Sequence, residues 1–302
     1  MSHPLAPVAD LTGQDWTLAW TLDPWVVLLL AASAGLYLSG WAQLDPWLRR
    51  RLGAWRPAAF LGGLAAIFLA LASPLDRFAS FLLQLHMTQH LLLMMLAPPL
   101  LWLGAPVAPM LRGLPQPVRR LVASWLARPP VRRLARLLGH PVTCWLAFVA
   151  AVWVWHVPAL YELALRGHGW HHLEHACFFA TALLFWWPVV QPWPAQAVWP
   201  RWTAIPYLLL ADVQNTVLSA FLTFVDRVIY PAYAAAPRLW QISALEDQAA
   251  AGAIMWVPGA VAFILIGAWV AYGLLTPRMV APDAAPVPET SIAQPNAPEP
   301  SG

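Results

Sequence analysis

The sequence predicts an all-α, polytopic membrane protein with about seven transmembrane helices packed in one bundle. Of the 302 residues, 60% are hydrophobic and only 10% are charged, whereas about a quarter of the residues in a soluble domain are charged. Runs of about twenty apolar residues recur along the chain, and each is long enough to cross about 30 Å of hydrocarbon as a helix. These observations argue against a soluble fold.

Seven apolar runs, each bounded by helix-breaking residues, are the expected transmembrane helices. They lie near Trp25–Trp41, Pro57–Ser73, Phe78–Leu103, Val142–Val157, His172–Val190, Thr203–Val225 and Ala249–Leu275. The third run is long for a single crossing and contains Pro98-Pro99, which predicts a kink or an early exit near its end.

The runs divide the chain into three parts. An extracytoplasmic N-terminal segment (residues 1–24) precedes the transmembrane domain (25–275), and a Pro/Ala-rich cytoplasmic tail (276–302) follows it. The N-terminal segment contains no Arg or Lys, so it lacks the positive region of a cleavable signal peptide and the first helix is expected to be retained. The tail composition predicts disorder.

The arginines predict the orientation of the bundle. The chain contains no Lys, so its net charge of +3 depends on Arg, and cytoplasmic loops of membrane proteins carry an excess of these residues. The loops after the first and third runs contain Arg49, Arg50, Arg51, Arg56, Arg112, Arg119, Arg120, Arg128, Arg132, Arg133 and Arg136. Both loops are therefore expected in the cytoplasm, with the N-terminus outside and the C-terminus inside. Arginines confined to such loops suit lipid headgroups, and no nucleic-acid partner is expected.

The second of these loops has two interpretations. Its stretch Leu111–Gly139 mixes Arg with apolar residues and is interrupted by Pro129-Pro130. This pattern is typical of amphipathic helices that lie under the headgroups. A basic loop whose arginines extend toward the headgroups explains the pattern equally well.

Seven of the nine histidines fall toward the extracytoplasmic end of the predicted bundle. They are His86, His90, His156, His168, His171, His172 and His175, and the exceptions are His3 and His140. His86, His90 and Met94 are spaced four residues apart, so they share one helical face. The histidines between positions 168 and 175 form a second stripe if the fifth helix begins early enough. Two imidazole stripes facing each other in an apolar bundle predict a metal site.

The residue types favour copper at this site. A single His in a transmembrane helix commonly bonds to a neighbouring helix, but ionisable residues at membrane depth are rare, so a cluster of them favours a functional site. Thioether sulfur beside imidazole favours copper over the hard cations. The predicted ligands are His86, His90, His172 and His175, with His156, Met94 and Met255 as secondary ligands. Paired histidines on neighbouring helices also ligate haem, so a bis-His haem protein is the alternative.

Two further carboxylates are functional candidates. Asp212 lies near the middle of the sixth run, where a proton relay and a helix–helix hydrogen bond are both open interpretations. A relay there, together with the histidines, would suit a transporter of protons or small solutes. Asp247 marks the extracytoplasmic entry to the seventh run, where it is either near the histidines or a solvated acidic residue at a helix N-terminus.

The segment from His171 to His175 also matches the H-x-x-E-H pattern of inverted zinc proteases. A five-residue match in a His-rich stretch is weak, and the third carboxylate ligand that such a protease requires is not evident. No enzymatic activity is therefore predicted.

Several strings of the chain, taken in order, resemble the seven-helix CtaG-like cytochrome c oxidase assembly factors of bacteria. They are His86-Met87-x-x-His90, Pro98-Pro99-Leu100-Leu101, Gly104-x-Pro106, Trp155-His156-x-Pro158-x-x-Tyr161, His172-Leu173-Glu174-His175, Phe185-Trp186-Trp187-Pro188, Tyr230-Pro231-x-Tyr233 and Asp247-Gln248-x-x-x-Gly252-x-x-Met255-Trp256. The resemblance covers the third to seventh runs, and it makes Glu174 a further candidate residue. The polar run around Asp212 has no place in the matching pattern.

The resemblance implies an accessory protein of the bacterial cell (inner) membrane that is needed to make active haem-copper oxidase. It implies that the chain handles copper for the oxidase, with the catalytic subunits of cytochrome c oxidase or other assembly factors as its partners. It does not supply established ligands, so the ligand choice above rests on spacing alone.

Overall fold

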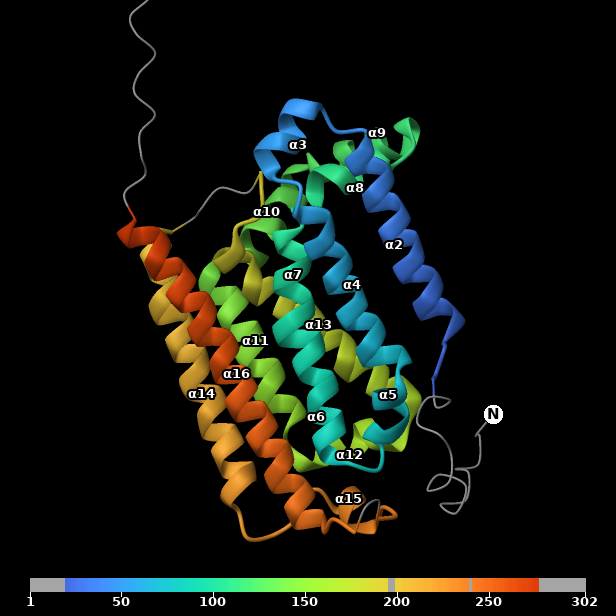
Figure 1. Ribbon diagram of the computed structural model, residues 1–302, viewed down its shortest axis with the longest axis vertical. Coiled ribbons are helices and arrows are strands. Elements are labelled where there is room, and N and C mark those ends of the chain that lie inside the picture. The colour runs from blue at the N-terminus through green and yellow to red at the C-terminus, as the bar shows by residue number, and fades with distance from the viewer. Residues whose placement is uncertain (1–19, 195–198, 239–240, 277–302) are drawn as a thin grey trace, which may run out of the picture.

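The computed structural model describes residues 20–194, 199–238 and 241–276, and every regular element in these ranges is a helix (Figure 1). The predicted tail and most of the predicted N-terminal segment lie outside the described residues. The longer helices are α2 (Pro24–Ala42), α4 (Arg56–Ala72), α11 (Pro141–Trp155), α13 (His168–Val190), α14 (Ala204–Phe224) and α16 (Ala244–Leu275). One further long helix is assembled from α6 (Leu83–Leu91), a π-helical turn (Leu92–Leu96) and α7 (Ala97–Leu103).

Short helices connect the long ones at both ends of the bundle. They are α3 (Pro46–Leu52), α5 (Pro74–Ala79), α8 (Val107–Gly113), α9 (Gln116–Leu126), α10 (Pro129–Leu138), α12 (Pro158–Arg166) and α15 (Pro231–Ala235). In Figure 1, α5, α12 and α15 lie at the lower end, and α3, α8, α9 and α10 lie at the upper end.

The helix lengths confirm an all-α polytopic membrane protein. Four helices are long and apolar enough to cross a membrane, and the number rises to seven if each of three bent pairs is one span. The bent pairs join α3 to α4 at 65°, the long α6–α7 helix to α8 at 71°, and α10 to α11 at 63°. Each of the seven predicted runs corresponds to one of these spans.

Two helix starts differ from the predicted runs. The fifth helix begins at His168 and not at His172, so all four histidines of the predicted stripe are helical. Phe78, where the third run was expected to begin, lies in the separate helix α5 because the chain turns between Ala79 and Leu83. The helix that carries His86 and His90 therefore starts only three residues before the first of them.

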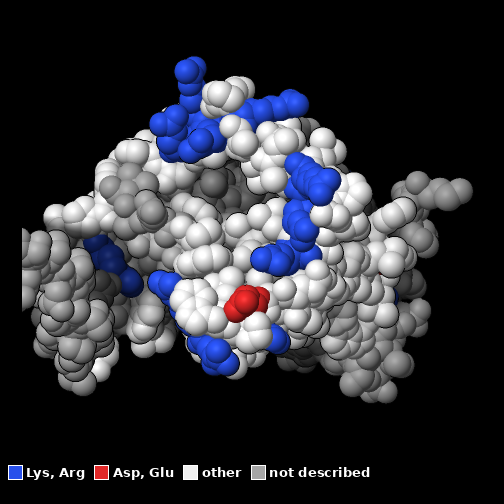
Figure 2. All heavy atoms as spheres, turned by 90° about the horizontal axis from the view of Figure 1, so that it is seen from above, with Lys and Arg blue, Asp and Glu red and all other residues white. Residues whose placement is uncertain are grey.

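The arginine-rich loops gather at one end of the bundle. Helices α3, α9 and α10 lie together at the upper end of Figure 1, and the view onto this end in Figure 2 shows Arg side chains spread over it around a small acidic patch. Both α9 and α10 form as helices and contain no buried residue. Their apolar side chains, such as Leu121, Trp125 and Leu137, are exposed. Such helices suit the headgroup layer of a membrane.

The two prolines of the third span produce a π-helical turn, and the span continues to Leu103 without leaving the bundle early. Proline has no N–H, so Pro98 cannot bond the carbonyl of Met94 four residues before it. The indole Nε1–H of Trp186 donates to that carbonyl over 2.8 Å. A side-chain donor on α13 thus replaces the backbone N–H that proline lacks. Such a replacement is required at membrane depth, where no water can bond the carbonyl.

The start of α6 depends on a side chain that is distant in sequence. Leu82, the residue before the helix, has no side-chain oxygen to bond the first N–H groups. The carboxylate of Asp247 on α16 accepts from the backbone N–H of Leu83 at 2.7 Å and of Gln84 at 3.2 Å. Asp247 is fully buried. Its position matches the predicted entry to the seventh helix, and its contacts make it a cap for α6.

We expect Asp247→Ala to destabilise the protein by about 1–3 kcal/mol, because two buried N–H groups lose their acceptor. Asp247→Asn keeps one carbonyl oxygen and should lose less. The thermal midpoint of the purified protein in detergent measures both effects. Equal midpoints for wild type and Asp247→Ala would contradict the capping role.

Close packing between α14 and α16 depends on a glycine. A Cβ at Gly252 would lie 2.7 Å from the backbone nitrogen of Thr223 and 2.8 Å from the carbonyl oxygen of Ser219. Small residues allow helix backbones to approach in membranes, where packing must replace the hydrophobic driving force. At Gly273, on the same helix, a Cβ would meet no atom within 4 Å.

Gly252→Ala should therefore lower the free energy of unfolding by about 1–3 kcal/mol through overpacking. Gly273→Ala should be neutral or slightly stabilising, because Ala favours the helix. Thermal unfolding of the two variants side by side separates them, and a Gly252→Ala protein as stable as Gly273→Ala would show that the helices are not in close contact there.

Candidate metal centre

Two helices supply a cluster of five ionisable side chains, buried or partly buried, at the lower end of the bundle. Helix α6 places His86 and His90 on one face, four residues apart. Helix α13 places His171, Glu174 and His175 on the face opposite, because Glu174 and His175 follow His171 by three and four residues. We call these five side chains the histidine cluster.

The ligand atoms of the histidine cluster lie close enough to share an ion. One nitrogen each of His86, His90 and His175 lie within 4.8 Å of one another, and the same holds for one atom each of His86, His171 and Glu174. His86 and Glu174 are fully buried, and His90 and His175 are 4% and 5% exposed. The rings pack edge to face, with centroids 4.4 Å apart for His86 and His90.

A tyrosine determines which nitrogen of His86 is free. The hydroxyl of Tyr233 donates to the carbonyl oxygen of Ala79 at 2.8 Å, so its single proton is used there. The 2.9 Å contact between Tyr233 Oη and His86 Nδ1 is then a bond donated by Nδ1–H. Burial holds the pKa of the Tyr233 phenol well above its usual value, so the hydroxyl stays protonated. The lone pair of His86 is therefore on Nε2, which faces the cluster.

The Nε2 atoms of His86 and His90 lie 2.9 Å apart, so one of them must donate to the other. Because Nε2 of His86 carries the lone pair, Nε2 of His90 carries the proton. An ion bound to both nitrogens at about 2.0 Å would fit this separation. Its binding requires the His90 proton to move to Nδ1, the other nitrogen of that ring.

Several buried atoms of the cluster have no hydrogen-bond partner among the described residues. They are His90 Nδ1, His171 Nε2, His175 Nε2 and both carboxylate oxygens of Glu174. The carboxylate oxygens lie 3.5 Å from His86 Nε2 and 3.9 Å from His90 Nε2. An unpaired buried carboxylate is costly, and a bound cation would compensate it. The donor set of imidazoles and one carboxylate therefore fits a transition-metal ion.

A surface pocket of about 320 Å³ reaches the cluster. His86 and His171 line it at depth, and the exposed residues Ser80 and Arg166 line its outer part. Asp76, which is partly buried, is the one carboxylate among the described residues of the lining. This pocket connects the buried imidazoles with the surface at the end of the bundle that carries α5 and α12.

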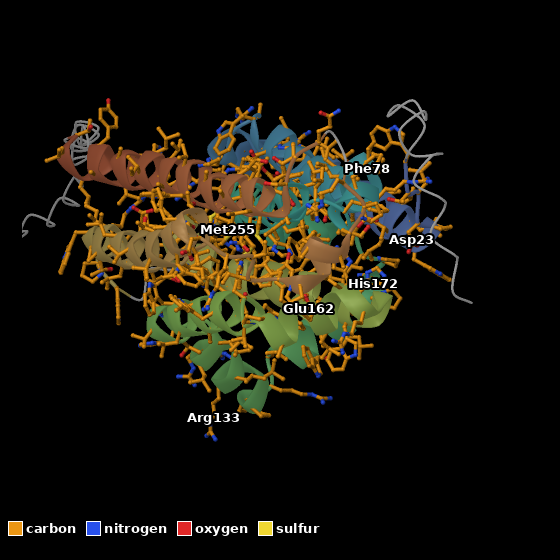
Figure 3. All side chains as sticks on the ribbon, turned by 90° about the horizontal axis from the view of Figure 1, so that it is seen from below. Asp23, Phe78, Arg133, Glu162, His172 and Met255 are labelled. Carbon is orange, nitrogen blue, oxygen red and sulfur yellow. The ribbon has the colours of Figure 1, made fainter. Side chains whose placement is uncertain are left out.

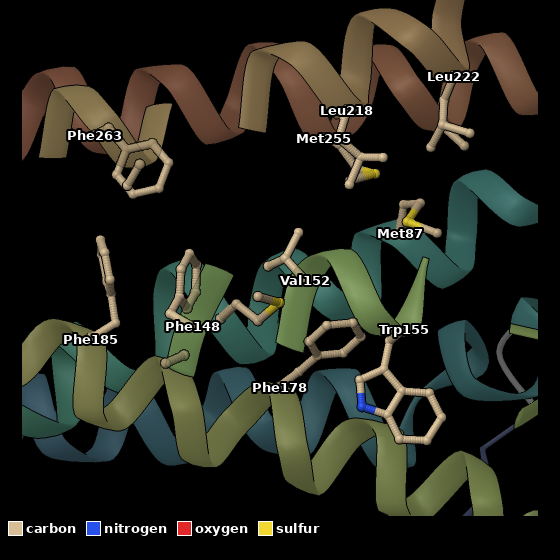
Figure 4. Packing of buried hydrophobic residues seen from close by; sticks show 14 of the residues in the cluster. Met87, Phe148, Val152, Trp155, Phe178, Phe185, Leu218, Leu222, Met255 and Phe263 are labelled. Atoms are coloured by element: carbon tan, nitrogen blue, oxygen red, sulfur yellow. The ribbon is translucent and has the colours of Figure 1, made fainter. Parts of the chain in front are cut away.

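A second, smaller cavity lies beside His90 and shares no lining residue with the surface pocket. Its volume is about 30 Å³, enough for a water or an ion, and its lining includes His90, His156, Met87, Met94 and Met255. Figure 4 shows Met87 and Met255 reaching the same part of the core from α6 and α16. We call this the methionine cavity.

The structure brings together most of the predicted ligands, except that His171 stands in the place predicted for His172. His86, His90 and His175 are in the histidine cluster, and His156, Met94 and Met255 line the methionine cavity beside it. His172 does not join them, because its side chain is exposed and neither group of ligand atoms includes it. Its neighbour His171 takes that place. In the view from this end, His172 and Met255 lie well apart (Figure 3).

The three candidate carboxylates have different surroundings. Glu174 is in the cluster, and Asp247 is a helix cap. Asp212 is partly exposed on α14, its Oδ1 has no partner among the described residues, and it belongs to neither ligand group.

Two residues of the candidate site were missing from the ligands predicted from the sequence. His171 belonged to the predicted stripe, but spacing could not rank it above His172. Tyr233 stood only in a matching string, and nothing in its spacing connects it to His86, which is 147 residues away.

Comparisons with known proteins agree with this architecture. The family model described as cytochrome c oxidase caa3 assembly factor (Caa3_CtaG) matches residues 35–276. The chain is similar to uncharacterized proteins of Mycobacterium bovis and Mycobacterium tuberculosis, each 29% identical over 262 residues, and of Mycobacterium leprae, 27% identical over 237 residues.

These matches cover 80%, 80% and 73% of this chain but 38%, 38% and 34% of the relatives' own lengths. The chain thus corresponds to less than half of each of these proteins. No solved structure matches it. The family match covers most of the chain, including all five residues of the histidine cluster, and it confirms the resemblance seen in the sequence. The chain belongs to the cytochrome c oxidase caa3 assembly factor family.

Proposed function

We propose that this chain is a non-catalytic assembly factor of the bacterial cell membrane that handles copper for the haem-copper catalytic subunit of cytochrome c oxidase. Copper is its cargo, and the histidine cluster is the place where the ion is held. The observation that carries the proposal is the set of buried imidazole and carboxylate atoms of α6 and α13 that have no hydrogen-bond partner among the described residues. Building such a set at membrane depth is costly unless a ligand uses it.

The charge distribution supports an extracytoplasmic position for the site. The arginine-rich helices lie at the end opposite the histidine cluster, and arginine-rich loops favour the cytoplasmic side. With this orientation the pocket beside Asp76 opens outside the cytoplasm. Copper would be bound or released there, in contact with oxidase subunits or other assembly factors.

Thioethers beside the imidazoles support copper over zinc. Soft sulfur ligands select Cu(I), whereas a carboxylate and imidazole site alone suits several divalent ions. Copper is preferred to haem because the rings that meet across the two helices are in edge-to-face contact, with centroids 5.4 Å apart for His90 and His175 and 5.1 Å apart for His86 and His171. A porphyrin plane needs the space between its two axial rings.

The purified protein should bind copper and show no Soret band. His90→Ala should lose the ion from the histidine cluster, because it removes a ligand that lies within reach of both His86 and His175. His172→Ala is the matched control, since His172 is exposed on the same helical turn as His175. Metal content and the visible spectrum measure these outcomes. A Soret band would redirect the function to haem, and equal copper in the two variants would exclude the cluster.

In cells that lack the native protein, His90→Ala should leave the oxidase deficient in copper, and His172→Ala should restore it. The copper content of purified oxidase, at matched levels of the two variants in the membrane, is the measurement. Normal oxidase copper with His90→Ala would exclude the copper role.

Tyr233→Phe should weaken copper binding by about 10- to 100-fold, the range for loss of a group that orients a metal-binding histidine. Tyr37→Phe is the control, because Tyr37 is equally buried and donates to the carbonyl of Gly104, away from the cluster. Tyr233→Phe loses two buried hydrogen bonds and Tyr37→Phe loses one, so a somewhat larger loss of stability is expected for Tyr233→Phe. Equal copper affinity in the two would show that Tyr233 has only a structural role.

A further inference from the structure

We propose that the methionine cavity is a second metal site, selective for Cu(I), and that His90 belongs both to the histidine cluster and to the lining of this cavity. This inference rests on the proposed copper function for its choice of ion. The cavity has its own donors, its own space and a separate position from the surface pocket beside Asp76, and each of these supports a distinct site.

The donors of the methionine cavity are soft and buried. Met87 is fully buried, and Met94 and Met255 are each 7% exposed. Met95 also contributes to the lining. Four methionines thus line one small cavity, and thioethers select Cu(I) over harder ions.

His156 adds an imidazole nitrogen whose lone pair has no use in the described structure. Its Nδ1–H donates to the carbonyl of Val152 at 2.7 Å, which leaves the lone pair on Nε2. That Nε2 is buried and has no hydrogen-bond partner among the described residues, and the side chain as a whole is 8% exposed. A nitrogen held in this tautomer by its own helix is prepared to bind a metal.

The backbone beside the methionine cavity has an unusual conformation. Met94 and Met95 both lie in the π-helical turn, which is a rare conformation found frequently at functional sites. The Met94 carbonyl is bonded by Trp186, so the local backbone needs no water in the cavity. The opposite wall is supported by Asn215, whose side-chain amide donates to the carbonyl of Met255 at 3.1 Å.

His90 connects the two sites. It lies in the histidine cluster with His86 and His175, and it also lines the methionine cavity. The hydrogen bond to His86 leaves the His90 lone pair on Nδ1, and that atom has no partner among the described residues. An ion on Nε2 in the histidine cluster puts the His90 proton on Nδ1, so His90 serves one site at a time. Passage of an ion from the imidazoles toward the thioethers returns that proton to Nε2.

The test uses the full-length protein in detergent with Ag(I), a closed-shell soft ion that stands in for Cu(I) without redox chemistry. Wild type should bind two equivalents, and Met94→Leu/Met255→Leu should bind one, because leucine keeps the volume and removes the thioether. His171→Ala should keep the equivalent in the methionine cavity. Met110→Leu is the control, since Met110 packs in a different apolar cluster.

X-ray absorption of the fully loaded wild type gives an answer that does not depend on variant folding. Sulfur scatterers bonded to the ion are expected in addition to nitrogen. One bound equivalent with no sulfur signal, unchanged by Met94→Leu/Met255→Leu, would overturn the second site and leave the proposed function intact. Failure of wild type to bind either Ag(I) or Cu(I) would overturn both.

Discussion

Backbone groups at membrane depth must be bonded inside the protein, and this requirement shapes the whole site. The chain interrupts its helices near the histidines, and each interruption is satisfied by a side chain from a distant segment. Asp247 bonds the first N–H groups of α6, Trp186 bonds the carbonyl that faces Pro98, and Tyr233 bonds the carbonyl of Ala79. These contacts connect the third span and the preceding helix α5 with α13, α15 and α16. The positions of His86 and His90 therefore depend on all three contacts.

The same contacts connect stability with the proposed chemistry. Tyr233 closes the end of α5 and at the same time leaves the lone pair of His86 on the nitrogen that faces the cluster. Trp186 stabilises a π-helical turn and thereby keeps two methionines beside His90. A protein that only needed to pack would place apolar residues here, because unpaired buried polar atoms are costly. The cost supports the proposal that the cluster binds an ion.

The arrangement of donors suggests the direction in which the proposed copper ion would move through the protein. The surface pocket near Asp76 reaches His86 and His171 of the histidine cluster, and the methionine cavity beside His90 is small and rich in sulfur. Ligands thus become softer with depth, which favours Cu(I) over the harder ions that the outer ligands also accept. Such a gradient would give a copper-handling protein selectivity without tight binding at the entrance.

The sequence by itself determined the membrane class, the seven apolar spans, the gathering of arginines in two loops and the cluster of histidines toward the opposite end. These features depend on composition and helical period, which are local properties of the chain. Only the tertiary structure decided that His171 and not His172 faces His86, that Asp247 caps α6, and that Met255 lies beside Met94. Helical spacing tells which residues share a face, but neighbouring helices set the rotation of that face about the axis. That rotation depends on contacts such as those at Gly252 and Trp186, between residues far apart in the sequence.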